Sequence, residues 1–110
     1  MNREPSTIAP RVSVIIPNYN HARFLEKRIQ SVLDQTEPPD ELIVVDDGST
    51  DGCETAVRRF GDRVRYLRQE NQGLAAARNT GIRAARGALV GLLDADDRWR
   101  PTFCAEMTGL

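Results

Sequence analysis

Short apolar runs alternate along the chain with longer amphipathic stretches, after a polar lead-in. Residues 1–11 are polar with two prolines, which predicts a disordered lead-in. The β-branched run at 12–16 predicts a buried strand that is stopped by Pro17. Apolar residues at helical spacing then predict a helix over about 21–35, with Asn20 as its N-terminal cap. The first part of the chain therefore predicts a strand followed by a helix.

The same two patterns recur through the rest of the sequence. They predict strands at 42–45, 64–68 and 88–93 and helices over about 50–60 and 73–86. Thr50 or Asp51 is the expected cap of the helix over 50–60. Arg65 and Arg68 interrupt the third strand, which is typical of a sheet edge. Strand–helix alternation predicts an α/β fold: a Rossmann-like parallel sheet, helices on both faces, and a ligand site at the carboxyl ends of the strands.

Composition and charge narrow the function classes. The 110 residues suffice for one domain, and 15 basic against 16 acidic residues leave a net charge of −1, which disfavours nucleic acid as a partner. Cys53 and Cys104 with a single histidine exclude a Cys/His zinc site. The sequence shows no signal-peptide pattern and no apolar run of membrane-spanning length. These features predict a cytoplasmic location, with membrane association open for a longer gene product.

Acidic residues follow the last predicted strand. Asp94 and Asp96 stand two positions apart and offer hard oxygen ligands of the kind that Mg²⁺ and Mn²⁺ prefer. The alternative is that they are turn and cap residues, because aspartate favours such positions. With a second acidic cluster at Asp46 and Asp47, the pattern favours a metal site.

Three further residues are candidates for ligand contact. One aspartate of the pair Asp46 and Asp47 is expected to accept a hydrogen bond from a base N–H or a ribose hydroxyl, and the other to belong to the turn. Tyr19 follows the first strand and either stacks on a base or packs against the domain. Arg78, on the third predicted helix, either reaches a diphosphate or lies on a solvated face.

Absent motifs exclude several nucleotide-binding classes. No Gly-rich dinucleotide fingerprint follows the first strand, and no GxxxxGK[ST] loop is present. The segment 17–20 lacks the basic, Gly-rich loop of a sugar-nucleotide pyrophosphorylase. A phospho-acceptor receiver domain would need an acidic pair after the first strand and a late lysine, but the only lysine is Lys27. A phosphate ligand would then have to be held through a cation.

Five segments in order resemble the glycosyltransferase family 2 proteins, which have the GT-A fold. They are VSVIIPNYN (12–20), SVLDQT (31–36), ELIVVDDGSTD (41–51), NQGLAAARNTGI (71–82) and LLDADDRW (92–99). The resemblance implies that residues 12–110 are the N-terminal, nucleotide-diphospho-sugar-binding part of a GT-A domain, truncated relative to the family. It also implies the strand order 3-2-1-4.

The resemblance implies roles for single residues. Pro17 and Tyr19 match positions that hold the nucleoside base, and Asp47 matches the aspartate that bonds it. Asp96 matches the metal ligand of a DxD motif, with Asp94 near the ribose or the metal, which would be Mn²⁺ or Mg²⁺. The full nucleotide-sugar-binding set comprises Pro17, Tyr19, Asp46, Asp47, Arg78, Asp94 and Ala95.

The implied reaction is inverting sugar transfer from a nucleoside-diphosphate sugar, with a UDP-sugar expected first, to an unidentified acceptor. The family's catalytic base lies beyond the DxD motif, and we expect it beyond Leu110, because Glu106 is too near that motif. The chain is therefore expected to bind donor without turnover. The alternative is a non-catalytic nucleotide-binding or scaffold remnant. The unpaired edge of the fourth strand predicts a homodimer.

Overall fold

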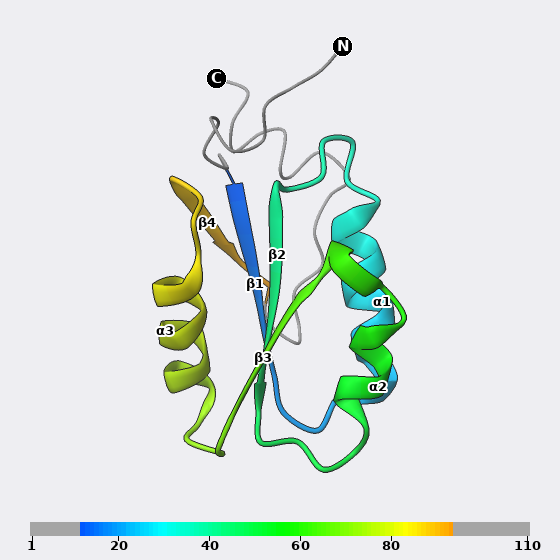
Figure 1. The fold of residues 1–110 in the computed structure, drawn as a ribbon, viewed down its shortest axis with the longest axis vertical. Coiled ribbons are helices and arrows are strands. Elements are labelled where there is room, and N and C mark those ends of the chain that lie inside the picture. Colours follow the sequence, from blue (N-terminus) through cyan, green and yellow to red (C-terminus); the bar gives the residue numbers. More distant parts are fainter. Residues whose placement is uncertain (1–11, 94–110) are drawn as a thin grey trace.

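The computed structural model describes residues 12–93, and these form a single parallel sheet with helices on both faces. The elements in chain order are β1 (Val12–Asn18), α1 (Ala22–Leu33), β2 (Glu41–Asp47), α2 (Cys53–Arg58), the 3₁₀ turn η2 (Gly61–Arg63), β3 (Arg65–Gln69), α3 (Leu74–Ala84) and β4 (Leu89–Leu92). The strand order is β3-β2-β1-β4, which confirms the predicted order 3-2-1-4. Figure 1 shows α1 and α2 on one side of the sheet and α3 on the other.

Each face of the sheet has its own core because side chains alternate along a strand. The α1/α2 face buries the larger cluster, which includes Val14, Ile16 and Val44 with Leu25 and Ile29 from α1. On the α3 face, Ile15, Ile43 and Val45 pack against Ala77. β1 is buried throughout its length, which is why it reads as a mainly apolar run, with Ser13 and Asn18 as its polar residues.

The prediction that Pro17 ends the first strand is wrong. β1 continues to Asn18, and Pro17 pairs with Val45 of β2. The carbonyl of Ile15 accepts a hydrogen bond from the backbone N–H of Leu93, so it points toward β4. The backbone nitrogen of residue 17, two positions on, points toward β4 as well. The paired part of β4 ends at Leu92, so the N–H that proline lacks is not needed by the ladder there.

Two predicted helix caps are also wrong. His21 is the N-cap of α1 and Gly52 that of α2, and neither is capped by its own side chain. Asp51 instead accepts a hydrogen bond from the backbone N–H of Ala22, at 2.9 Å, so it caps the neighbouring helix α1. Asn20 makes contacts with the loop after β2, described below.

Within residues 12–93 the edge position predicted for the third strand is confirmed, since β3 pairs there with β2 alone. β4 occupies the other edge of the described sheet and exposes Leu89 and Val90. None of the described helices is long and apolar enough to cross a membrane.

Candidate functional site

The carboxyl ends of β1, β2 and β3 and the amino end of α3 meet at one end of the sheet, the lower end in Figure 1. Parallel pairing brings them there, since Asn18 is in register with Asp46, and Asp47 with Gln69. Ligands of open parallel sheets bind at this end. The structure therefore brings together Pro17, Tyr19 and both aspartates of β2, as the sequence predicts.

The loop after β1 is fastened to the loop after β2. Asn20 has a positive φ of 50°, and its backbone N–H donates to Ser49 Oγ at 2.9 Å. The backbone N–H of Thr50 donates to Asn20 Oδ1, also at 2.9 Å. Asn20 is thus a bridge between two loops rather than the cap of its own helix. This pair of bonds fixes the backbone next to Tyr19.

Asp46 and Asp47 point to opposite faces because they are neighbours on a strand. Asp46 lies on the α1/α2 side and is fully buried. Its Oδ1 accepts from the backbone N–H of Ser49 at 2.9 Å, and its Oδ2 accepts from Arg68 Nη1 at 2.9 Å and from the hydroxyl of Tyr66. Both carboxylate oxygens are therefore engaged within the chain.

Asp47 lies on the α3 side and organises the loop between β3 and α3. Its Oδ1 accepts from Gln69 Nε2 and from the backbone N–H of Gln72, both at 2.9 Å. Its Oδ2 accepts from the backbone N–H of Gly73 at 2.9 Å and from Asn71 Nδ2 at 3.3 Å. Burial alone would raise the pKa of Asp47, but the bonds from Gln69, Gln72 and Gly73 outweigh it and lower that pKa. Asp47 is thus a charged anchor with four donors.

Gly48 allows the two loops to approach this closely. It has a φ of +80°, and a Cβ built on it would lie 2.7 Å from the backbone nitrogen of Asn71. No side chain fits in that space, and few L-residues adopt that φ. The glycine that the sequence shows as a turn residue is therefore also a contact point between the loops after β2 and β3.

The remaining predicted site residues differ in exposure. Pro17 is buried in β1, whereas the Tyr19 side chain is 42% exposed at the rim and accessible to a ligand. Arg78 lies in the second turn of α3 and is half-buried. Asp94, Ala95 and Asp96 lie outside the described residues, so the metal site predicted there stays a prediction.

The aspartates of β2 do not fit a metal site. In residues 12–93 no three His, Cys, Asp or Glu side chains are grouped so that they could hold a metal ion. Asp46 and Asp47 face opposite sides of the sheet, and each is engaged by donors from the chain itself. The predicted metal ligands Asp94 and Asp96 lie outside residues 12–93.

The sequence reasoning missed the partners of the two aspartates. The sequence pattern does not mark Tyr66 and Arg68 as site residues, and it indicates only a sheet edge at Arg68. The signal that could have found them is the strand register. Tyr66 and Arg68 lie two positions apart on β3, so they share one face of the sheet, and Arg68 is in register with Asp46. Gln69 and Asn71 were also missed, because nothing in a linear sequence shows which loop a carboxylate will bind.

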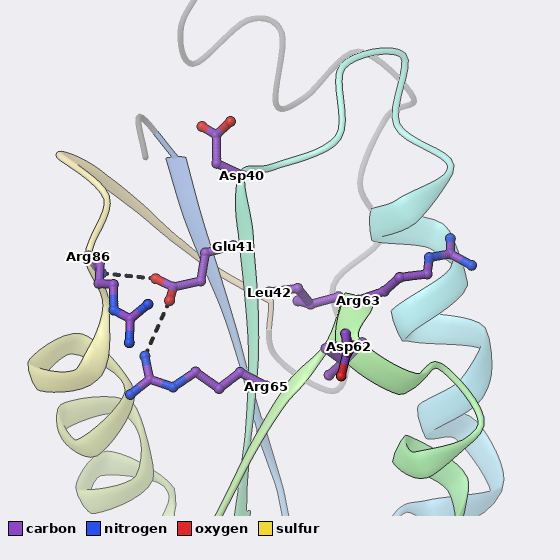
Figure 2. A pocket seen from close by; sticks show the side chains of 8 residues that line it. Asp40, Glu41, Leu42, Asp62, Arg63, Arg65 and Arg86 are labelled. Carbon is purple, nitrogen blue, oxygen red and sulfur yellow. Dashed lines mark hydrogen bonds and ion pairs between the residues drawn. The ribbon is translucent and has the colours of Figure 1, made fainter. Parts of the chain in front are cut away.

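A hollow of about 420 Å³ lies at the opposite, amino end of the strands (Figure 2). Glu41 Oε1 accepts from Ser13 Oγ at 2.8 Å and from the backbone N–H of Arg86 at 2.9 Å, and its Oε2 accepts from Arg65 Nη1 at 3.2 Å. Arg65 Nη1 also donates to the carbonyl of Ala84 at the end of α3. These contacts connect β1, β2 and β3 with α3 and the residue after it, so Glu41, Arg65 and Arg86 form a structural network on one side of the hollow.

Comparison with known proteins gives one family and a consistent set of relatives. A family model described as Glycosyl transferase family 2 matches residues 13–109. An uncharacterized glycosyltransferase of Nostoc sp. is 45% identical over 95 residues, which are 83% of this chain and 30% of that protein. The chain spans well under half of the length of the curated relatives that it matches.

Solved structures share the fold. The mannosyltransferase PcManGT from Pyrobaculum calidifontis, solved with GDP-Man and Mn²⁺, is 40% identical with a TM-score of 0.74, over 84% of this chain and 29% of that one. TarS of S. aureus, solved with UDP, is 27% identical with a TM-score of 0.81, over 90% of this chain and 31% of that one. The described sheet has the architecture of these GT-A enzymes.

Proposed function

This chain belongs to the glycosyl transferase family 2. From that premise we propose that it is the donor-binding part of an enzyme that transfers the sugar of a nucleoside-diphosphate sugar to an acceptor hydroxyl. The observation that carries the proposal is the joining of three strand-end loops at one end of the sheet by Asn20, Ser49 and Asp47. Such fastening holds a binding surface in place before the ligand arrives, which lowers the entropic cost of binding.

Each residue of this end has a proposed part. Tyr19 stacks on the base, and Pro17 supports the backbone beneath it. Asp47 accepts a hydrogen bond from the base. Its carboxylate already accepts four hydrogen bonds, so the base N–H either replaces one of these donors or shares an oxygen with one. Arg78 faces the diphosphate. Asp96, with Asp94 and Ala95 beside it, would hold the diphosphate through Mn²⁺ or Mg²⁺.

The reaction proposed is inverting transfer, in which a carboxylate base takes the proton of the acceptor hydroxyl as its oxygen attacks the anomeric carbon, and the nucleoside diphosphate leaves. Within residues 12–93, Asp46 and Asp47 are committed to hydrogen bonds and are not assigned as that base. We propose that these 110 residues bind the donor nucleotide without turning over, with UDP as the first nucleotide to test.

The experiment is a calorimetric titration of the chain with UDP and with GDP, each with and without Mn²⁺. Metal-dependent binding of either supports the proposal, and UDP preference supports a UDP-sugar donor. In Tyr19→Ala, loss of base stacking should weaken affinity by roughly 10–100-fold, the equivalent of about 1–3 kcal/mol. Phe24→Ala removes an equally exposed ring, on α1, and should leave affinity unchanged.

Absence of binding to both nucleotides, with and without the metal, would contradict the proposal and favour a scaffold remnant. A transferase assay of the same preparation that gives steady turnover would contradict the absence of the base. If Tyr19→Ala binds nucleotide as tightly as the wild type, the proposed stacking of Tyr19 on the base is wrong, whereas the proposal that the chain binds nucleotide still stands.

A homodimer through β4 is a separate part of the proposal. Leu89 and Val90 are exposed on this edge strand, and Ile82 is exposed on α3. Unpaired backbone groups beside apolar side chains favour strand addition. We expect concentration-dependent dimerisation in sedimentation velocity, abolished by Val90→Lys and kept in Phe24→Lys, which places the charge on α1. A monomer at all concentrations would contradict it.

A further inference from the structure

The carboxylate of Asp46 is a negative charge inside the fold. Its side chain is 0% exposed. It lies near the carboxyl end of β2 on the α1/α2 face of the sheet, between β3 and the loop after β2. A buried carboxylate is costly unless it is paired and hydrogen-bonded. The groups that surround Asp46 therefore show what this charge is used for.

Two of its donors come from the edge strand β3. Arg68 Nη1 lies 2.9 Å from Asp46 Oδ2 and forms an ion pair with it, and the Tyr66 hydroxyl donates to the same oxygen. Burial, together with the bond to Asp46, raises the pKa of Tyr66 to about 12. The phenol therefore keeps its proton, and remains a donor, at neutral pH.

The third donor lies in the candidate site. Asp46 Oδ1 accepts from the backbone N–H of Ser49, which closes the turn after β2. The side chain of that same Ser49 accepts from the backbone N–H of Asn20, and Asn20 in turn accepts from the backbone N–H of Thr50. A continuous series of hydrogen bonds thus runs from β3, through Asp46 and Ser49, to the residue next to Tyr19.

We propose that Tyr66 and Arg68 are positioning residues: acting through Asp46, they hold the loops after β1 and β2 in the conformation that presents Tyr19 to the nucleoside base. The nucleotide part of this inference rests on the proposed function, whereas the holding of the loops does not. In this inference Asp46 acts through the loops, since it is fully buried and its oxygens accept from Ser49, Arg68 and Tyr66.

A purely local role as an edge-strand ion pair explains less of the geometry. Pairing of β2 with β3 requires only the backbone ladder, and an ion pair of the half-exposed Arg68 that served the sheet edge alone would contribute little to stability. Instead, two β3 side chains converge on one oxygen while the other oxygen holds the loop. The arrangement connects the edge strand to the site rather than to the sheet alone.

The test uses Tyr66→Phe, which removes only the hydroxyl, and Arg68→Met, which removes the charge and keeps the length. Arg68→Lys returns a charged donor. Arg65→Met is the matched control, because Arg65 also lies on β3 and pairs with a carboxylate, Glu41, but at the other end of the sheet. The readouts are amide hydrogen exchange at residues 18–22 and 47–52 and the affinity for UDP with Mn²⁺.

We expect Tyr66→Phe and Arg68→Met to speed exchange in the two loops, but not in α3, and to weaken nucleotide affinity about tenfold. Compared with Arg68→Met, Arg68→Lys should recover most of the loop protection and most of the nucleotide affinity. Arg65→Met should leave affinity within about twofold of the wild type, whatever its melting temperature. If Arg68→Met does not fold, Tyr66→Phe and Arg68→Lys decide the matter.

Unchanged loop exchange in Tyr66→Phe would overturn the proposal, as would faster exchange with unchanged affinity. An equal loss of affinity in Arg65→Met would show a general loss of stability and would overturn it too. If the wild type binds neither UDP nor GDP, the proposed function fails. In that case the exchange data alone decide whether the two β3 residues hold the loops.

Discussion

At the scale of single residues, the end of β2 shows how strand geometry divides work between two identical side chains. Asp46 and Asp47 differ by one position, and so one serves the α1/α2 side and the other the α3 side. Asp46 holds the loop after its own strand, and Asp47 holds the loop after β3. Gly48, which follows them, completes the arrangement by letting the chain pass against Asn71.

Gly48 and Gly52 offer a matched pair for testing that close approach. Their φ angles are +80° and +88°, so an alanine pays the same left-handed penalty at both, about 1 kcal/mol. A Cβ at Gly48 would also lie 2.7 Å from the Asn71 nitrogen, while one at Gly52 meets nothing within 4 Å. We expect Gly52→Ala to cost about 1 kcal/mol and Gly48→Ala about 2–3 kcal/mol in urea unfolding.

Equal losses in the two variants would show that the loops after β2 and β3 move apart easily. The same pair also tests the site, since only Gly48→Ala displaces the loop that Asp47 holds. We expect weaker nucleotide binding in Gly48→Ala and unchanged binding in Gly52→Ala.

At the scale of elements, α3 packs on the sheet through small residues. Gly81 and Ala77 are buried on its inner face, and a Cβ on Gly81 would lie 2.5 Å from Ile15 Cγ2 in β1. Ile15 is fully buried, and close packing of a protein core leaves such a side chain little room to shift. The absence of a side chain at position 81 therefore sets how closely α3 approaches β1, and with it where the amino end of α3 stands.

Gly81→Ala tests packing against helix propensity. Alanine gains about 1 kcal/mol of propensity in a helix, but overpacking a rigid core costs about 1–3 kcal/mol. Because the contact is at 2.5 Å with a buried side chain, we expect a net loss of stability. In an Ile15→Ala background the clash is removed, so there Gly81→Ala should be neutral or stabilising in a double-mutant cycle by urea unfolding. Additive effects would contradict this account.

At the scale of the whole molecule, the two ends of the sheet have separate tasks. The carboxyl ends carry the joined loops of the candidate site, and the amino ends carry the Glu41 network beside the hollow in Figure 2. Burial raises the pKa of Glu41, but bonds from Arg86, Ser13 and Arg65 lower it below its usual range. A carboxylate with a lowered pKa stabilises the fold above its unfolded-state pKa, and this contribution is lost as the pH falls through the folded value.

Glu41→Gln should therefore be less stable than the wild type at pH 7, by about 1–3 kcal/mol for a charged group with several donors. The difference should shrink as the pH falls through the lowered pKa of Glu41 in the folded protein, where the wild-type carboxylate takes up a proton. Urea unfolding across pH measures it. Nucleotide affinity should stay unchanged at pH 7, and a large loss of affinity would show that the two ends are coupled.

Much of this protein follows from its sequence alone. Alternating apolar runs and amphipathic stretches predict the α/β class, because periodicity is a local property that records which face of each element is buried. The five motifs, by resemblance, give the strand order β3-β2-β1-β4, which the structure confirms. They also place Tyr19 and Asp47 at a common end.

Only the tertiary structure decided how the loops are held. Asp51 caps α1 rather than its own helix, Asn20 bridges two loops, and Tyr66 and Arg68 hold Asp46. These partners are some 20–30 positions apart, and polar side chains in loops follow no period that a linear pattern could reveal. Each of these hydrogen bonds forms between residues that only the packing of the sheet brings close together, so the partner of each donor is determined by the tertiary structure.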